Sequence, residues 1–541
     1  MKNKIKEILN NAFYQLLAIY TILIILITLG VFTKYIIHME IFALIIGILG
    51  FFIVKKDTKI KEHELKFLEN KKIHYAILFL LLLLILILRA IPYLSNSIPL
   101  GYDAGMYKYA IEHGLENMDK WVVMIEEPGF LYLMSAIKIF LSTHFILTWL
   151  FILFNVLLGF AIYLTTKEYF NKTCAIIALF VYAFSIIQFK VFEFMYYRNI
   201  LGITIALFAL YFLKKGRKYD LIAFSILGII LAGIHKPTFY LFGLSYFLYS
   251  FTSPIKIGKN EKTKYEIKLL AKNVIIGIII LAGASLFYLG NFSTQITSLI
   301  EPILIGFVNT GESPGTFISF FQYQFATLIY LPFALIGFIY LIRKRQFNML
   351  FFWTLISALI VYFQFFFFNR FIIFLDVGLI ILSSVGVFSI INHRKKLNYI
   401  IVTILAVCLI FSSFSYTLNS KSSLNKSEFN TINKLSDFAD ENSYVMTTSS
   451  LYSPWIQGYS DRKTIAPGLF DYDIHNKSEW VNFWASTNQS EKIEFISDYK
   501  KEYNSTIYIF IGEKQGDNLQ NIGCIMLLYQ DNSNKIYRYD C

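Results

Sequence analysis

Long apolar segments alternate with short polar segments along most of the chain. A helix needs roughly 20 mostly apolar residues to cross a bilayer, and its backbone must satisfy its own hydrogen bonds there. Residues 73–93 form such a segment. The pattern predicts about thirteen transmembrane helices. They cover residues 12–33, 36–54, 73–93, 145–165, 173–189, 192–213, 221–234, 238–251, 273–289, 325–342, 349–368, 371–391 and 399–415.

Short basic clusters lie between these segments and predict the orientation of the chain. If every segment crosses once, all the clusters fall on one side, and Lys and Arg are enriched in cytoplasmic loops. We therefore expect a cytoplasmic N-terminus. The clusters are Lys2, Lys4 and Lys6, residues 55–72, 214–218 and 256–272, Arg343 to Arg345, and Arg394 to Lys396. The other, outer face then receives residues 93–144, 190–199, 235–237, 290–324, 369–370 and everything after Tyr416.

The residues after Tyr416 are richer in Asn, Ser, Asp and Lys, and their apolar stretches are short. Segments 443–448 and 506–511 predict buried strands, and 524–530 with 535–539 predict a hairpin. Helical periodicity marks 426–440 and 491–503. We expect a water-soluble α/β domain on the outer face. The predicted domains are an N-terminal hairpin with its basic loop (1–72), a transmembrane core (73–418) and this C-terminal domain (419–541), so the fold class is mainly α.

Composition supports this class. The chain has 541 residues, of which 56% are hydrophobic and 16% charged, which excludes an ordinary soluble globular protein. The net charge of +13 does not indicate nucleic acid, because the basic residues are topology clusters rather than a basic domain. Four cysteines are too few and too scattered for a disulfide scaffold or a zinc site. Cys524 and Cys541 flank the predicted hairpin, where a disulfide is allowed on the outer side.

An acidic residue, Asp103, follows the third apolar segment at the expected membrane boundary. A carboxylate in this place can act as a general base. The alternative is a loop Asp that caps a helix over residues 104–114. Tyr107 lies at i+4 on the same helix face. Glu127 ends the same loop and either joins Asp103 or belongs to a solvated acidic pair before a helix that begins with Pro128.

Four cationic or titratable side chains lie on the expected outer face. Arg198 and Arg370 are candidates to bind phosphate, and His235 with Lys236 is a candidate anion site or a plain turn between two helices. Arg198 is alternatively a snorkelling Arg at a helix end. Arg370 stands between two Phe-rich runs, where a bidentate anion would offset its burial. Asp376 is its alternative, structural partner.

A long outer loop, residues 290–324, contains the segment 309–316, which is rich in turn-forming residues and carries Glu312. Loops of this length are often lids or substrate loops. Glu301 is an equal candidate for the functional acid in this loop.

The layout resembles the GT-C membrane glycosyltransferases, and within them the catalytic subunits of oligosaccharyltransferases. Residues 101–109 resemble the first-loop Asp motif of the class. Residues 196–202 resemble the start of a helix that carries an acidic metal-binding motif. Thr310-Gly311-Glu312 is similar to the late-loop Glu motif, and Asn369-Arg370-Phe371 to the late Arg that meets the lipid-linked phosphate. Residues 458–468, with Arg462, resemble the segment around the acceptor motif.

Two departures from that pattern limit what the resemblance implies. Ile203 and Thr204 stand where the second acidic motif belongs, so the ligands of a divalent metal such as Mn²⁺ or Mg²⁺ are incomplete and unknown. Residues 450–454 replace the Trp-Trp-Asp-Tyr-Gly acceptor motif. Transfer of a sugar is thus better supported than transfer of an oligosaccharide to protein.

The resemblance implies an inverting glycosyltransferase of the cell membrane. It would take a sugar from a polyprenyl-phosphate-linked donor and give it to an acceptor glycan, lipid or protein on the outer face. Asp103, Glu312 and Glu127 would be catalytic, and Arg370, Arg198, His235, Lys236, Tyr107 and Arg462 would bind substrate. The alternatives are a divergent oligosaccharyltransferase that acts on protein Asn, and a transporter of a lipid-linked or anionic substrate. Broken helices and inverted repeats typify transporters, and the sequence indicates neither.

The predicted topology can be tested by labelling single cysteines in a background without native cysteines. Cysteines at Ser313 and Ser478 should react with an impermeant reagent added outside intact cells, and a cysteine at Lys259 should not, because only the last lies in a basic cluster. Labelling of Lys259 from outside would overturn the assignment of every loop.

Overall fold

The structure is a computed structural model that describes residues 2–31, 33–53, 65–94, 96–114, 127–252, 262–289, 318–365, 367–392, 396–447, 450–465, 474–514, 517, 519 and 522–541. The chain divides into two compact units. The helical unit comprises residues 1–91, 152–192 and 197–419, and the α/β unit comprises residues 92–151, 193–196 and 420–541.

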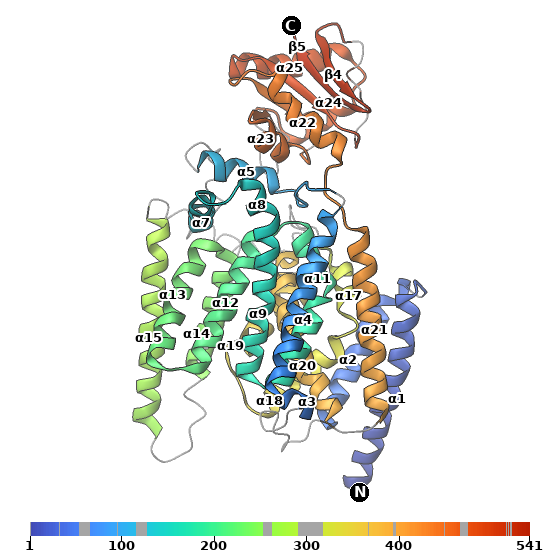
Figure 1. The fold of residues 1–541 in the computed structure, drawn as a ribbon, viewed down its shortest axis with the longest axis vertical. Coiled ribbons are helices and arrows are strands. Elements are labelled where there is room, and N and C mark those ends of the chain that lie inside the picture. The colour runs from blue at the N-terminus through green and yellow to red at the C-terminus, as the bar shows by residue number, and fades with distance from the viewer. Residues whose placement is uncertain are drawn as a thin grey trace. The chain divides into compact units, whose positions relative to one another are not determined.

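The helical unit consists of long helices and a few short ones, and most of them run side by side (Figure 1). Each of the predicted apolar segments overlaps at least one of them. They are α1 (Lys2–Thr28), α2 (Ile36–Ile53), α4 (Lys71–Ala90), α9 (Phe151–Tyr169), α10 (Lys172–Ala183), α11 (Ile186–Glu193), α12 (Tyr197–Lys215), α13 (Lys218–Ile234), α14 (Lys236–Thr252), α15 (Lys262–Ser285), α17 (Phe320–Thr327), α18 (Leu331–Arg343), α19 (Met349–Tyr362), α20 (Phe368–Ile391) and α21 (Lys396–Asn419).

The structure gives a partial test of the predicted number of membrane-spanning helices. Among the described residues, 7 helices are long and apolar enough to span a bilayer, or up to 9 if each of two bent helix pairs is one span. The expected count of about thirteen is therefore not confirmed, because several apolar segments form helices of 17 residues or fewer. The chain is nonetheless a multi-pass membrane protein.

Two helix breaks, which the sequence did not indicate, divide apolar segments of the helical unit. The helices α10 and α11 meet at 52°, and α17 and α18 meet at 83°. Ser185 lies in the first break, where its hydroxyl accepts a hydrogen bond from the backbone N–H of Gln188 (3.2 Å). Tyr330 lies in the second break, and Pro332 follows in the first turn of α18. Each break thus has an identifiable local cause.

Asp376, on the almost fully buried helix α20, connects both breaks. One carboxylate oxygen accepts hydrogen bonds from the Ser185 hydroxyl (2.9 Å) and the Gln188 amide (2.8 Å), and the other accepts one from the Tyr330 hydroxyl. Gln188 also donates to the carbonyl of Ile373 (3.3 Å). Hydrogen bonds from neutral donors offset the burial of this carboxylate.

The α/β unit contains a mixed five-stranded sheet with strand order β2-β1-β3-β5-β4. Strands β2, β1 and β3 are parallel, and β3, β5 and β4 are antiparallel. The strands are β1 (Tyr444–Thr447), β2 (Lys463–Ile465), β3 (Ile507–Ile511), β4 (Ile525–Asp531) and β5 (Asn534–Tyr539), and the C-terminal helices are α22 (Lys426–Phe438), α23 (Ser453–Ser460), α24 (Lys477–Ala485) and α25 (Gln489–Tyr503).

The predicted strands, hairpin and two helices of the C-terminal region are confirmed, whereas α23, α24 and β2 were not predicted. These three elements are short, with 8, 9 and 3 residues, and such lengths leave little periodicity to read. The core of the unit is aromatic: Trp480 and Phe483 of α24 pack with Phe495 and Tyr499 of α25 against the sheet.

The α/β unit also includes the loop that follows α4, which the predicted domain boundaries assigned to the transmembrane core. This loop forms the helices α5 (Ala104–His113), α7 (Pro128–Lys138) and α8 (Thr143–Phe145). Helix α5 packs directly on α23. The division into units places Asn419 at the end of the helical unit, and the predicted C-terminal domain began at this residue.

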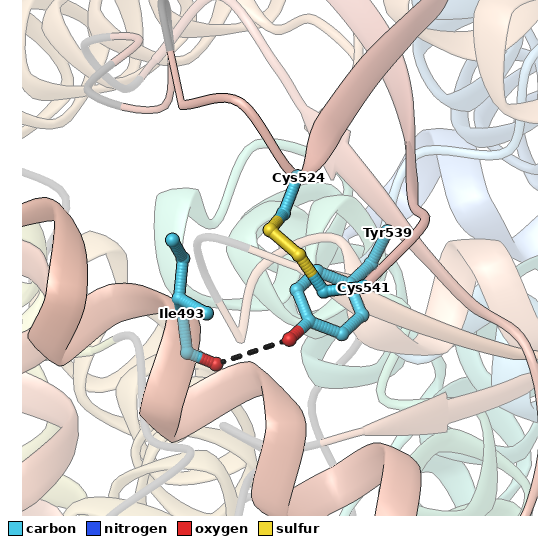
Figure 2. Close-up of a disulfide and its surroundings, with 4 residues drawn as sticks. All are labelled: Ile493, Cys524, Tyr539 and Cys541. Atoms are coloured by element: carbon cyan, nitrogen blue, oxygen red, sulfur yellow. Dashed lines mark hydrogen bonds between the residues drawn. A yellow bond between two sulfur atoms is a disulfide. The ribbon is translucent and has the colours of Figure 1, made fainter.

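A disulfide between Cys524 and Cys541 closes the end of the chain onto the sheet (Figure 2). Their Cα atoms are 5.2 Å apart, within the usual range for a disulfide. The backbone N–H of Asp540 donates to the carbonyl of Cys524 (2.9 Å), and the hydroxyl of Tyr539 donates to the carbonyl of Ile493 on α25 (3.3 Å). The pairing that the sequence allowed is thus present in the structure.

We predict that Asp376→Ala destabilises the helical unit, because it removes the acceptor of three buried hydrogen bonds, from Ser185, Gln188 and Tyr330. The loss should be on the order of 3 kcal/mol, and Asp376→Asn should lose less because it retains one acceptor oxygen. The thermal midpoint of the detergent-solubilised protein measures this.

The matched control is Ser389→Ala on the same helix. It removes a buried hydroxyl that donates to the Val385 carbonyl of that helix (2.8 Å). An equal loss from Asp376→Ala and Ser389→Ala would show that Asp376 does not hold the two breaks.

Candidate functional site

Asp103 stands at the N-cap position of α5, but its side chain does not cap the helix. Its backbone carbonyl accepts the first helical hydrogen bond, from Tyr107 (2.9 Å). The alternative in which Asp103 is an ordinary capping residue is therefore wrong, because its carboxylate makes no capping hydrogen bond. The side chain is half-buried. A half-buried carboxylate that is not used to start its helix can take part in chemistry.

Two glycines on either side of Asp103 allow very close backbone packing. A Cβ atom on Gly101 would lie 2.2 Å from the Cβ of Met195, and one on Gly105 would lie 1.9 Å from the carbonyl oxygen of Pro454 in α23. Across that second contact, a Cβ on Gly458 would lie 2.1 Å from the carbonyl oxygen of Gly105. No side chain fits at these positions, so the spacing Gly-Tyr-Asp-Ala-Gly follows from the packing around Asp103.

Hydrogen bonds fix the segment that leads to Asp103. The hydroxyl of Tyr102 donates to the carbonyl of Ser450 (2.5 Å). Ser422 donates through its hydroxyl to the carbonyl of Pro99 (2.8 Å), and the backbone N–H of Ser423 donates to the carbonyl of Leu100 (3.1 Å). These contacts hold the backbone of Asp103 in place, as a positioned catalytic group requires.

The charge of Asp103 affects the neighbouring Tyr102 hydroxyl. Burial raises the pKa of the Tyr102 hydroxyl, and the negative charge of the neighbouring Asp103 raises that pKa further. Tyr102 therefore stays neutral and remains a hydrogen-bond donor. On α23, which packs on α5, burial raises the pKa of the Tyr459 hydroxyl, and the negative charge of Glu112 raises this pKa further.

Glu127 and Tyr107 lie in the same unit as Asp103, and both are only 2% exposed. Glu127 is the N-cap residue of α7 and, like Asp103, makes no side-chain capping bond. The ring of Tyr107 packs edge-on against Phe130 of α7, with centroids 5.4 Å apart. Tyr107 therefore joins α5 to α7, and its predicted contact with substrate stays a prediction.

Arg370, in the first turn of α20, has no ionic partner in the described part of the chain. It is half-buried, and its guanidinium lies over the ring of Phe367 (5.8 Å). Asp376 is occupied by neutral donors, so the alternative in which Asp376 pairs with Arg370 is wrong.

The preceding residue, Asn369, strengthens the case for an anion at this helix start. It is 2% exposed, and among the described residues both of its amide atoms lack a hydrogen-bond partner. A free cation, a free amide and the positive end of a helix form a place for an anion.

His235 connects the starts of three helices. Its ring lies 6.3 Å from that of Phe374, one turn after Arg370 on α20. A Cβ on Gly202, one turn after Arg198 on α12, would lie 2.9 Å from the Cβ of His235. The next residue, Lys236, begins α14, and its ammonium lies over the ring of Tyr288 (5.5 Å).

His235 itself is 5% exposed, and its Nδ1 shares a hydrogen bond with the hydroxyl of Thr238 (2.6 Å). This contact positions the ring, and the predicted binding role of His235 stays a prediction. Arg198, Lys236 and Arg370 lie in the first turns of α12, α14 and α20, the three helices that His235 connects.

Arg462 has a structural role that the sequence did not indicate. Its guanidinium donates to the carbonyls of Ala439 (2.8 Å), Asp461 (3.1 Å) and Ser436 (3.3 Å). The bonds to Ser436 and Ala439 satisfy carbonyls at the C-terminal end of α22. The prediction that Arg462 binds substrate therefore finds no support in its contacts.

Glu312 and Glu301, the candidate acids of the long loop, lie outside the described residues. Within the described residues, no group of three His, Cys, Asp or Glu side chains is arranged to hold a metal ion. This part of the chain does not fit the metal that the resemblance implied, and the mechanism proposed below has no metal-dependent step.

Sequence reasoning missed two polar residues of the helical unit, Asn369 and Arg89. Asn369 was only part of the Asn369-Arg370-Phe371 motif and was not a candidate by itself. Arg89 lies in the last turn of α4 and is 0% exposed. A single Arg near the end of an apolar helix usually snorkels to water. No sequence signal therefore distinguishes the buried Arg89 from an arginine that only marks the membrane boundary.

Comparison with known proteins gives a clear result only for structure. No protein-family model matches the sequence, and a search of curated proteins finds no match. The oligosaccharyltransferase of Archaeoglobus fulgidus in the apo form aligns with a TM-score of 0.50 at 16% identity, covering 81% of this chain and 69% of that one.

ArnT from Cupriavidus metallidurans, solved bound to undecaprenyl phosphate, aligns with a TM-score of 0.57 at 10% identity, covering 86% of this chain and 97% of that one. The apo state of ArnT aligns with a TM-score of 0.53 at 10% identity, over 82% of this chain and 93% of that one. Both proteins are GT-C enzymes. With the helical bundle, the first loop and the C-terminal α/β domain in place, this chain has the GT-C fold that the sequence resemblance predicted.

Proposed function

We propose that the chain is a membrane glycosyltransferase that transfers a sugar from a polyprenyl-phosphate donor to an acceptor on the outer face of the membrane. The observation that carries the proposal is Asp103, a carboxylate that is held in place by close glycine packing yet is not used to cap its helix. The GT-C fold supports it, because the similar ArnT structure contains undecaprenyl phosphate.

Asp103 would act as the general base. It would accept the proton of the acceptor group as that group attacks the anomeric carbon, while the bond from this carbon to the phosphate oxygen breaks. A base removes a proton in the transition state efficiently when its position is fixed. The tight packing of Gly101 and Gly105 supplies that fixed position.

Arg370 would stabilise the phosphate that leaves. Its guanidinium offers a fork of donors that matches a phosphate group, and no carboxylate among the described residues competes for it. The Asn369 amide and the first turn of α20 would add donors, and Arg198 and Lys236 would add positive charge. Such preorganised donors stabilise charge that develops on the leaving group.

Glu127 remains a proposed helper of Asp103, since both acids begin helices of the same unit. The acceptor remains open between a glycan, a lipid and a protein, and transfer to protein Asn is the second form of this proposal. Orientation with the α/β unit outside the cytoplasm follows from the basic clusters, and the Cys524–Cys541 disulfide supports it because disulfides persist in oxidising compartments.

Transport of a lipid-linked substrate is a weaker alternative. The two broken helix pairs are a feature that transporters share. Here, however, the hydrogen bonds of Asp376 hold both breaks to one buried helix. We therefore favour transfer over transport.

We predict that Asp103→Asn binds donor normally but transfers sugar roughly 10²-fold more slowly or worse, as expected for a lost general base. The release of sugar-free polyprenyl phosphate from the glycosylated lipid measures transfer, and co-purified lipid measures binding. Glu112→Gln is the control, because Glu112 lies on the same helix but pairs with Lys108 (2.5 Å). Parental transfer by Asp103→Asn would exclude Asp103 as the base.

We predict that Arg370→Met lowers donor binding and turnover together, by roughly tenfold or more, because it removes the phosphate fork but keeps much of the apolar stem. Arg370→Lys should recover only part of the loss, since an ammonium is a point charge. The exposed Arg345→Met, which removes the same charge elsewhere, should have no effect. The absence of an ion pair to Asp376 means that folding should survive, and an unchanged Kd for donor in Arg370→Met would place the phosphate elsewhere.

A further inference from the structure

Arg89 is a fully buried guanidinium that lacks a protein acceptor. It is 0% exposed, and none of its three nitrogens has a hydrogen-bond partner among the described residues. The guanidinium lies over the rings of Phe189 (4.6 Å) and Phe192 (5.7 Å) of α11. Aromatic faces attract a cation, but they accept none of its five N–H groups in the manner of an oxyanion.

An arginine that is buried without an acceptor is costly in a membrane protein, and such residues usually mark a binding site. Arg89 has no part in the proposed reaction. It contacts α11 through Phe189, whereas Gln188 of α11 bonds to Ile373 and Asp376 of α20. Arg89 therefore contacts α11 at Phe189. The helix α20, which carries Arg370, contacts α11 at the neighbouring residue Gln188.

A second positive charge lies near the same aromatic side chains. The ring of Phe189 packs edge-on against Tyr416 of α21, with centroids 5.7 Å apart. The ammonium of Lys190 lies over the ring of Tyr416 (5.6 Å) and donates to the side-chain carbonyl of Gln322 (2.8 Å). Lys190 is 8% exposed. The rings of Phe189 and Tyr416 thus lie between two buried cations.

An apolar cavity of about 290 Å³ lies deeper in the same helices, close to the smaller ligand pockets of proteins, which hold about 300 Å³. Its walls come from α4, α10, α18, α20 and α21. They include Ile77 and Leu81 of α4, Phe180 and Val181 of α10, and Leu405 and Leu409 of α21.

The cavity and the cations are aligned along shared helices. Arg89 follows Leu81 by eight residues on α4, and Tyr416 follows Leu409 by seven on α21, which at 1.5 Å per residue places both about 11 Å further along. Phe189 follows Val181 across the bend between α10 and α11. The helices α4 and α21 therefore carry both cavity-lining residues and residues of the cation cluster, and α10 lines the cavity before the bend into α11.

We propose that Arg89 binds the phosphate of an amphiphilic lipid whose apolar tail occupies this cavity. The site lies apart from the donor phosphate proposed at Arg370 and does not depend on which reaction the protein catalyses. The phosphate group could belong to a polyprenyl carrier or to an ordinary glycerophospholipid. In either case the lipid supplies the acceptors that Arg89 lacks in the protein.

Native mass spectrometry of the purified full chain tests this with two probes that share one tail, polyprenyl monophosphate and polyprenol. The Arg370→Met background removes the other proposed phosphate site. In that background the protein should prefer the phosphate by tenfold or more, and adding Arg89→Met should abolish the preference. Adding Arg345→Met instead should leave it intact. A preference that survives Arg89→Met overturns the proposal, whatever happens to sugar transfer.

Thermal stability separates binding from a purely structural role. Arg89→Met should melt no lower than the parent without lipid, because it removes a buried charge that lacks an acceptor, and the stabilisation by polyprenyl phosphate should vanish. If Arg89 only holds α4 to α11, the variant melts lower and keeps the lipid-induced shift, and the proposal is wrong.

Two further measurements define the lipid. Leu405→Phe, which narrows the cavity, should weaken the binding of both probes equally. Unchanged binding would show that the lipid tail does not occupy this cavity. Displacement of polyprenyl phosphate by an equal amount of phosphatidylglycerol would identify a general phospholipid site, and resistance to displacement would identify a site for the isoprenoid carrier.

Discussion

The helical unit depends on how one buried carboxylate is satisfied. Asp376 accepts hydrogen bonds from Ser185, Gln188 and Tyr330, so a single side chain of α20 fixes the breaks in two other helix pairs. A backbone that breaks inside a membrane must be held by protein, because lipid offers no hydrogen bonds. Since Asp376 is used in this way, Arg370 one and a half turns earlier pairs with no carboxylate in the part of the chain that the structure describes, and we propose that its charge serves an anion.

A similar division of roles holds in the α/β unit. Close glycine packing and hydrogen bonds together fix the chain around Asp103: Gly101 fits against Met195, Gly105 fits against Pro454, and the Tyr102 hydroxyl donates to the carbonyl of Ser450. The side chain of Asp103 makes no capping hydrogen bond to α5, so the carboxylate is not used to start its helix. A positioned carboxylate that is not used in this way can serve as a base.

Much of this could be predicted from the sequence, because long apolar segments and alternating strands carry strong periodic signals. The helices and the C-terminal hairpin were predicted in this way, whereas the roles of Asp103 and Arg370 rest on their charge and position and stay predictions. Contacts between residues far apart in sequence could not be. Arg462 binds the end of α22, His235 joins three helix starts, and Asp376 bonds to neutral donors rather than to Arg370. Each depends on tertiary neighbours that no local pattern reveals. The helix breaks were missed because Ser185 and Tyr330 lie within continuous apolar segments.

The central claim is that the protein handles a polyprenyl-phosphate-linked sugar, and the lipid that co-purifies with it tests that claim most directly. Protein extracted in mild detergent and analysed by mass spectrometry should carry polyprenyl phosphate or its glycosylated form, enriched over the surrounding membrane. Arg370→Met should carry less of the glycosylated lipid. If only glycerophospholipids are found, in the proportions of the bulk membrane, the protein does not use a polyprenyl-phosphate donor and the account is contradicted.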